Sequence, residues 1–439
     1  MKSNGIFKAL PVLDNRESWL LGRPRNLWLA IIALMAFLAM AWLAYQSFRY
    51  FADPGVIANR HISPGAIDLH NRFRETRAWF LGRRVYGNLF PDAVYPPASY
   101  ALFKIAFSSI RWRVVKIAWY ILSLISVSVF SWQLVRHSLA QARHERIFIG
   151  LMPFAFYATG AALGNGQLVL FVLPLLLSSL LLLAQPLLSK RHLWIGSGLM
   201  VVALIQPTIA APFFWLLLLR PPRFRPGAYV VSAYLALSAF AISFQLHAFQ
   251  RTGHSVQPVR FVSQWARKAH GGTVAGSVLG GYGTVHNLLA YFHLSRLNMP
   301  VSVGILLALG AWIFRNRRAD LWLLLGVTSI VARVWAYHRW YDDLLLLLPL
   351  IGLFRLTRLP QYGQLLKSLA ALLFVWIWMF LLAPGVLYLL PSPQILIAIQ
   401  VLGWLSALVF LVIVVERESV FSVPPLASSP HSVTTSAPD

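Results

Sequence analysis

The sequence predicts an all-α polytopic membrane protein, and three observations lead to this prediction. Of the 439 residues, 58% are hydrophobic. Only 12% are charged, whereas a soluble globular domain carries roughly 25%. Apolar runs recur almost to the C-terminus, and a helix of about 20 apolar residues is long enough to cross a bilayer. Their number and spacing predict a bundle of roughly 12–13 transmembrane helices.

The charge of the chain is strongly basic, with 38 Lys and Arg against 13 Asp and Glu and a formal charge of +25. In a soluble protein such a charge would indicate nucleic acid as a partner. Here the basic residues gather in short loops between apolar segments, where they fix topology and meet anionic headgroups. Membrane lipids, and not nucleic acid, are therefore the predicted partners. The absence of cysteine excludes disulfides and thiolate chemistry.

The chain divides into a short N-terminal segment, one membrane domain and a tail. Basic residues outnumber acidic ones in residues 1–26, which predicts a cytoplasmic N-terminus. Residues 27–415 form the membrane domain, beginning with a retained helix, because no small-residue cleavage site follows the first apolar run. Residues 416–439 are rich in Ser, Pro and Thr and are predicted to be disordered. A multi-pass protein of the inner (plasma) membrane is expected.

Two long loops are predicted on the outer face, at residues 49–94 and 249–298. Segment 98–110 would be only about 20 Å long as a helix, so we expect it to be re-entrant or to lie in the interface. This choice also keeps every later basic loop on the cytoplasmic side. The unusual polar residues then collect on the outer face, which predicts a one-sided site. A transporter more often has two related halves and polar signals near mid-membrane, and we see no internal repeat.

The first outer loop contains the strongest candidate for chemistry, Asp68. On a helix, Asp68, Arg72 and Glu75 would share one face. A surface ion pair explains this spacing equally well. Two observations favour a functional role: acids are scarce in the chain, and the loop also carries Arg74 and further arginines. A basic outer loop opposes the usual topology bias, and it is what a phosphate-bearing substrate requires, with Arg72 and Arg74 as candidate ligands.

Three further motifs add polar groups on the same face. Tyr95 precedes two prolines that either form a rigid helix entry or lie beside a substrate. The Gly-Asn-Gly-Gln sequence ending at Gln167 is either a tight turn or a source of amides, Asn165 and Gln167, that bind sugar hydroxyls. Gln206 begins a similar Gln-Pro-Thr motif. We take Tyr95, Asn165, Gln167 and Gln206 as candidate substrate-binding residues.

A late outer turn places His338 and Arg339 just before Asp342 and Asp343. His338 or Arg339 would meet phosphate oxygens in charge-assisted hydrogen bonds. The acidic pair is compatible with a divalent cation, but without further acids it equally suits a helix N-terminus. No metal and no cofactor is predicted.

The order of these motifs resembles glycosyltransferase family 87, whose members include polyprenol-phosphate-mannose-dependent mannosyltransferases of the GT-C superfamily. The resemblance covers roughly residues 60 to 350. Gln206 stands where a lysine is common, and Arg72 where an aromatic residue is frequent. The motifs that carry it are Asp68-Leu69, Gly82 to Tyr86, Tyr95-Pro96-Pro97, Gly164-Asn165-Gly166-Gln167 and Gln206-Pro207-Thr208.

The resemblance implies a GT-C-like hexosyltransferase that takes a mannose-like sugar from a polyprenyl-phosphate donor on the outer face and gives it to a lipid or glycan acceptor. Asp68 would be the general base of an inverting transfer, and His338 the group beside the donor phosphate. Two alternatives from other classes remain. A transporter or flippase of lipid-linked sugars would use the same basic surface without needing Asp68. A non-enzymatic subunit of envelope polysaccharide assembly would need neither.

Overall fold

The computed structural model describes residues 25–52, 65–86, 90, 93–107, 110–185, 188–219, 225–251, 283–385 and 394–421. These ranges hold sixteen α-helices and two short 3-10 helices. Within the same ranges, the only β-type pairing is one isolated bridge between Phe156 and Leu382. The predicted all-α class is confirmed.

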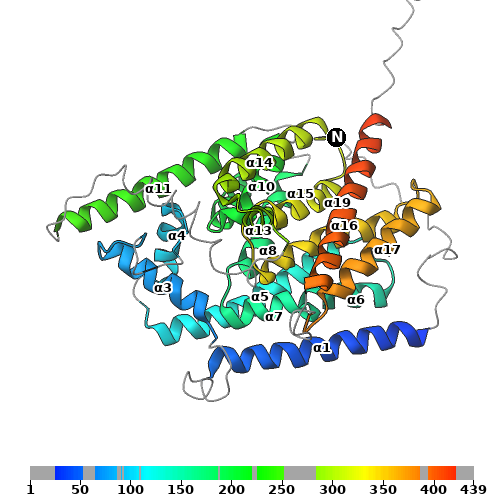
Figure 1. The fold of residues 1–439 in the computed structure, drawn as a ribbon, viewed down its shortest axis with the longest axis horizontal. Helices are drawn as coiled ribbons and strands as arrows, with labels where there is room; N and C mark the ends of the chain where they lie inside the picture. Colours follow the sequence, from blue (N-terminus) through cyan, green and yellow to red (C-terminus); the bar gives the residue numbers. More distant parts are fainter. Residues whose placement is uncertain are drawn as a thin grey trace, which may run out of the picture.

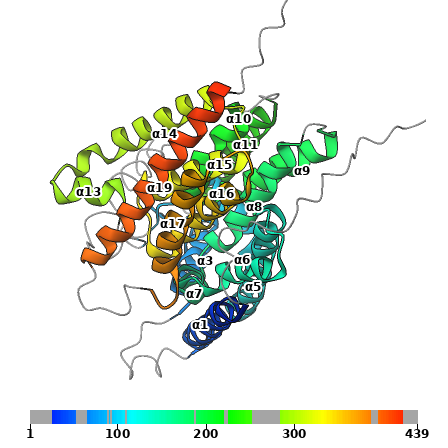
Figure 2. The same cartoon turned by 90° about the vertical axis from the view of Figure 1, so that its right-hand side faces the viewer.

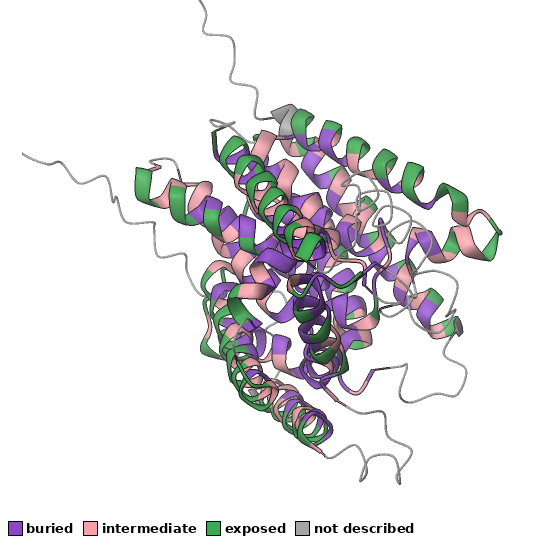
Figure 3. Cartoon of the chain, turned by 90° about the vertical axis from the view of Figure 1, so that its left-hand side faces the viewer, coloured by how far each residue is buried: buried purple, intermediate pink, exposed green. Residues whose placement is uncertain are grey.

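Six helices are long and apolar enough to cross a membrane. Their most apolar stretches are only 17 to 39% buried inside the protein, as expected for helices that face lipid. Figure 3 shows this for α1, whose outward side is largely exposed. The six are α1 (Arg25–Phe51), α5 (Trp112–His137), α11 (Arg225–Arg251), α14 (Asn298–Arg315), α17 (Gln364–Leu381) and α19 (Gln394–Phe421).

Shorter helices fill the space between the long ones, with α15 and α16 near the middle of the bundle (Figure 2). Nearly every residue of α15 and α16 is buried. At 14 residues, α15 is about 21 Å long, which is less than the apolar core of a bilayer. The shorter helices are α6 (Arg143–Ala155), α7 (Tyr157–Asn165), α8 (Val169–Leu183), α9 (Lys190–Ala203), α10 (Pro207–Leu219), α15 (Leu321–Val334) and α16 (Leu347–Arg358).

The number of long spans is therefore smaller than the 12–13 predicted from the apolar runs. Six helices in the described part qualify by length and composition, or seven if the bent pair α7 and α8 counts as one span. The reason is that several apolar runs are broken. The apolar run over residues 147–162, predicted as one span, is divided at Phe156, whose extended backbone separates α6 from α7. Pro153 inside α6 removes a backbone donor close to this break.

The turn between α7 and α8 changes the direction of the chain by 115°. Gly166 adopts the left-handed conformation there, with φ of 71°, which glycine reaches without the steric cost of a Cβ. The Gln167 amide donates to the Ala162 carbonyl at 2.8 Å, which satisfies a carbonyl at the helix end. The bend brings the polar residues of this turn to one end of the bundle.

Two helices lie at that end, at the left of Figure 1: α3 (Ile67–Phe80), within the predicted first outer loop, and α4 (Pro97–Phe107), just after it. With 11 residues, α4 is about 16 Å long and too short to cross a membrane alone, in agreement with the expectation for segment 98–110. It packs against α3 and α11. Trp79 of α3 donates to the Ala241 carbonyl of α11 at 3.0 Å, which fixes α3 against the bundle.

Helices occupy parts of two segments that were predicted as a tail and a loop. The last helix, α19, continues to Phe421, so the tail predicted to begin at residue 416 starts inside a helix. The second outer loop, 249–298, contains helix α13 (Val285–Tyr291) and the 3-10 helix η1 (Ser295–Leu297). Residues 252–282 of this loop, the N-terminal residues 1–24 and the tail from residue 422 lie outside the described residues.

Candidate functional site

The ends of three helices meet closely around Gly65. The Ala66 amide donates to the Gly164 carbonyl at 2.7 Å, so the start of α3 is tied to the end of α7. A Cβ on Gly65 would lie 2.4 Å from the Arg49 carbonyl oxygen of α1, so only glycine allows this approach. On the other side of the turn, a Cβ on Gly166 would lie 2.7 Å from the Leu69 Cβ. The first turn of α3 is therefore held in a defined position.

The 165–167 turn connects two charged side chains through its amides. Gln167 Nε2 donates to the Asp68 carboxylate, and Arg49 donates from its guanidinium to Asn165 Oδ1. Asp68 lies in the first turn of α3 and is partly exposed. A carboxylate there is favoured by the positive end of the helix dipole. The predicted amides are thus next to the predicted acid, and in this structure they hold charged protein groups.

Arg72 forms an ion pair with Glu75, as the spacing allowed, but the pair is buried and not at the surface. Arg72 Nη1 lies 2.6 Å from Glu75 Oε2, and the two side chains are 9% and 2% exposed. The Tyr100 hydroxyl donates to the same carboxylate oxygen at 3.2 Å. The Arg72 guanidinium also lies 4.6 Å from the ring centre of Tyr95. The charge of Arg72 is therefore balanced by Glu75 within the protein, and the guanidinium lies against the face of the Tyr95 ring.

Burial raises the pKa of the Tyr95 hydroxyl above its usual value, against the opposing effect of the Arg72 charge. The carboxylates of Asp68, Glu75 and Asp342 act in the same direction as burial. Tyr95 is therefore a neutral hydroxyl at neutral pH, able both to donate and to accept a hydrogen bond.

The turn between α15 and the 3-10 helix η2 (Trp340–Leu346) orients His338. His338 is 1% exposed, and its Nδ1 lies 3.0 Å from Asp342 Oδ2. The backbone amide of Arg339 donates to the same oxygen at 3.2 Å. His338 Nε2 and Asp342 Oδ1 are buried without a hydrogen-bond partner among the described residues. The imidazole is thus fixed at one nitrogen, as in a carboxylate-oriented histidine.

The second acid of the pair, Asp343, belongs to a different network inside the bundle. Arg333 of α15 and the hydroxyl of Tyr157 of α7 both donate to its carboxylate. Gln400 of α19 donates to the Tyr157 hydroxyl at 3.2 Å. The described residues contain no group of three or more His, Asp or Glu side chains placed to hold a metal ion. The two acids bind separate partners: Asp342 contacts His338, and Asp343 accepts from Arg333 and Tyr157.

Electrostatic effects show that the two parts of the site lie close together. The Asp68 carboxylate raises the pKa of Tyr95 and of Arg339, as one of several smaller contributions in each case. Arg339 is exposed, and its Nε donates to the Tyr337 hydroxyl at 2.7 Å. The structure therefore brings Asp68, Gln167, Tyr95 and Arg339 into one region, next to the buried His338.

Two predicted residues have less direct links to this region. Arg74 is exposed on α3, 5.9 Å from the ring centre of Phe90. Gln206 is buried between α9 and α10, and its Oε1 has no partner among the described residues. Its neighbour Ile205 accepts a hydrogen bond from Ser99 of α4 at 2.8 Å. Gln206 is thus placed beside the helix that follows Tyr95.

Two polar residues at the end of α1, Gln46 and Arg49, were not predicted from the sequence. They are 0% and 7% exposed. An arginine at the end of an apolar helix ordinarily reaches toward the interface, so Arg49 did not stand out. The one signal in the sequence was the i, i+3 spacing, which places both side chains on one face of a helix.

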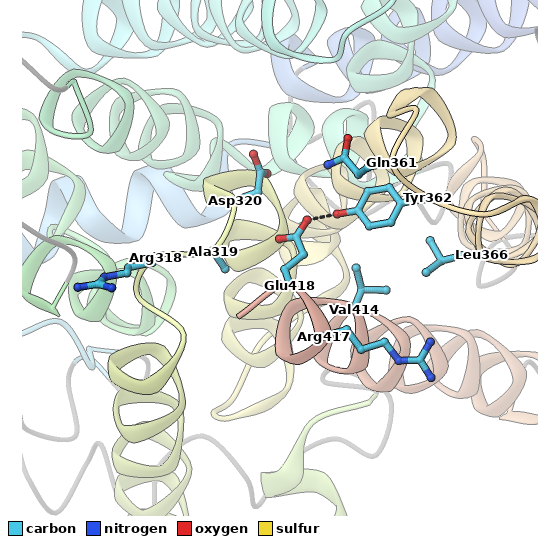
Figure 4. Close-up of a pocket in the computed structure, with 9 residues that line it drawn as sticks. All are labelled: Arg318, Ala319, Asp320, Gln361, Tyr362, Leu366, Val414, Arg417 and Glu418. Atoms are coloured by element: carbon cyan, nitrogen blue, oxygen red, sulfur yellow. Dashed lines mark hydrogen bonds between the residues drawn. The ribbon is translucent and has the colours of Figure 1, made fainter. Parts of the chain in front are cut away.

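A separate cavity of about 530 Å³ lies at the other end of the bundle (Figure 4). Tyr362 donates to Glu418 inside it, whereas Arg318 and Arg417 point away from its centre. It opens beside Asp320 at the start of α15, while His338 follows the end of α15, about 21 Å away along the helix. None of the predicted site residues lines this cavity. It is distinct from the site around Asp68.

The fold and the six long apolar helices define an integral, polytopic, all-α membrane protein. Its polar residues of interest gather at one end, around the first turn of α3. Comparisons of the chain with protein-family models, with curated proteins and with solved structures gave no match.

Proposed function

We propose that the protein is a membrane glycosyltransferase of GT-C type, which transfers a hexose from a polyprenyl-phosphate donor to a lipid or glycan acceptor on the outer face of the plasma membrane. The observation that carries the proposal is the placement of Asp68. It is a partly exposed carboxylate, oriented by Gln167 in the first turn of α3, beside Tyr95 and the cationic Arg339.

The chemistry requires a base for the acceptor and cations for the leaving phosphate. In an inverting transfer, the Asp68 carboxylate takes the proton of the acceptor hydroxyl, whose oxygen bonds to C1 of the sugar as the bond from C1 to the donor phosphate breaks. A proton acceptor within reach typically contributes about 10²–10⁴-fold. The hydrogen bond from Gln167 aims the carboxylate before the acceptor arrives.

The leaving phosphate carries negative charge that needs compensation in a poorly hydrated region. The exposed guanidinium of Arg339 and the Nε2 atom of His338 are the groups proposed to meet it, with Arg74 as a further surface cation. Asp342 accepts from His338 Nδ1, so Nε2 can donate to a phosphate oxygen when the imidazole carries both protons. Arg72 already pairs with Glu75, so we assign it the positioning of Tyr95 instead.

The test is transfer by the purified Asp68→Asn variant. The variant keeps the shape and an acceptor oxygen but loses the base, so we expect donor binding to stay intact while the transfer rate falls by about 10²–10⁴-fold. Arg77→Gln, an exposed position on the same helix, is the matched control and should transfer normally. Glycosidic product and donor binding must be followed together. Unchanged transfer by Asp68→Asn would remove Asp68 from the mechanism. Transport of intact donor without glycosidic product would favour the transporter interpretation.

A further inference from the structure

A cluster of buried polar side chains lies at the end of α1 and is joined to the 165–167 turn through Asn165. It is formed by Gln46 and Arg49 of α1 with Gly164 and Asn165 of α7. Gln46 is fully buried, and both Nε2 and Oε1 lack a hydrogen-bond partner among the described residues. Its Oε1 would lie 2.1 Å from a Cβ on Gly164, so the absence of a side chain at Gly164 makes room for this amide.

Arg49 brings a positive charge into the same cluster. It is 93% buried, and within the described residues its one hydrogen-bond acceptor is the neutral Asn165 Oδ1. Its Nε is buried without a partner. A guanidinium carries five N–H donors and cannot lose its charge in a protein. Within the described residues no carboxylate forms an ion pair with Arg49. A buried cation without an anion is costly, so this arrangement favours a site that receives an anion.

Exposed apolar side chains of α1 and α5 surround the Gln46–Arg49 cluster, as at a membrane surface. Arg49 stands in the last turn of a long apolar helix, between Phe48 and Phe51, whose side chains are 46% and 47% exposed. On the adjacent α5, Ile117 and Ile121 are 45% and 51% exposed. Phe51 packs on Tyr120 of α5 with 4.8 Å between ring centres, so these apolar faces flank one another. Acyl chains are matched to such faces, and a phosphate at their head would lie at the level of Arg49.

We infer that the Gln46–Arg49 cluster binds the phosphate of an anionic phospholipid. The guanidinium fork of Arg49 meets two phosphate oxygens, and the Gln46 Nε2 amide donates to a third. Asn165 keeps the guanidinium in position. This site is separate from the donor-phosphate groups His338 and Arg339, and it does not depend on the proposed glycosyl transfer.

The experiment measures lipid binding by the purified full-length protein in an uncharged detergent, with no sugar donor present. Three probes are compared: phosphatidylglycerol, the diacylglycerol with the same acyl chains, and inorganic phosphate. We expect tight binding of phosphatidylglycerol alone. Arg49→Gln should weaken it by about tenfold to a hundredfold, because charge-assisted bonds are lost. Arg77→Gln, which removes an exposed arginine of α3, should leave it unchanged.

Gln46→Met gives a second test that is independent of the charge. It replaces two unpaired buried polar atoms by an apolar side chain of similar length, so the fold should be as stable as the original or more stable. Phosphatidylglycerol binding should still weaken. Equal binding by Arg49→Gln and the unmodified protein, or equal binding of diacylglycerol, would overturn the inference. Equal affinity for inorganic phosphate and phosphatidylglycerol would overturn the assignment of a lipid ligand. The Gln46–Arg49 cluster would then be a site for free anions.

Discussion

Replacing Glu75 with glutamine tests whether the Arg72–Glu75 pair supports the fold or serves a substrate. The variant removes the carboxylate 2.6 Å from the Arg72 guanidinium, in a pair whose Arg72 side chain is only 9% exposed. Removing one partner of a buried ion pair costs about 3–5 kcal/mol. The entropy of unfolding is about 2.1 cal/mol/K per residue, so for 439 residues it is roughly 0.9 kcal/mol/K. The expected fall in melting temperature is therefore about 3–5 °C.

The assay is thermal unfolding in detergent, with donor binding measured on the same samples. The double variant Glu75→Gln, Arg72→Met removes both charges and should recover most of the lost stability, since replacing a whole buried pair by apolar groups is often neutral. Arg77→Gln on the exposed face should change the melting temperature by less than about 1 °C. A Glu75→Gln variant as stable as the original would refute the structural role, and tighter donor binding by that variant would return Arg72 to the phosphate ligands.

Two further predictions concern the same end of the bundle. Gly166→Ala should destabilise the protein by about 1–3 kcal/mol and slow transfer, because φ is 71° and the new Cβ would lie 2.7 Å from the Leu69 Cβ. Gly198→Ala, with open space around it in α9, should be neutral or stabilising in the same unfolding assay. The pKa of His70 is lowered from 6.5 by desolvation, by Arg74 and by Lys116, so the unfolded chain binds this proton first and stability should fall as the pH drops below about 6.5. His70→Gln should reduce that fall between pH 7.5 and 5, and an unchanged pH slope of the melting temperature would contradict it.

The fold class was predictable because composition and apolar runs report directly on burial in lipid. The number of spans was not, because an apolar run does not reveal where the helix breaks. The helix breaks at Phe156, where the backbone is extended. Pro153 lies three residues earlier, but a proline does not by itself locate a break, because α8 and α10 each continue past an internal proline. Likewise, α15 and α16 are apolar because they lie inside the protein rather than against lipid. Hydropathy is the same in both cases, and only packing separates them.

The site was partly predictable, for a related reason. Asp68, Gln167, Tyr95 and Arg339 stood out as polar residues at the ends of apolar runs, and the structure places them together. Spacing on a helix correctly put Arg72 and Glu75 on one face, but it did not reveal that this face is buried against Tyr100. Pairings between distant segments, such as Gln167 with Asp68, depend on the 115° bend at Gly166. No local pattern encodes that angle.

The two adjacent acids, Asp342 and Asp343, hold the 337–343 turn through hydrogen bonds in two different directions. Asp343 points into the bundle, where Arg333 and Tyr157 bind it, and Asp342 turns toward His338 and the Arg339 amide. A buried ion pair adds little stability compared with apolar packing, so stability alone does not account for this arrangement. What it does supply is orientation, because a charged hydrogen bond fixes a side chain in direction as well as in distance. With Asp343 anchored in the bundle, Asp342 can move little, and His338 is held at the end of α15 with its Nε2 atom directed away from the bond to Asp342.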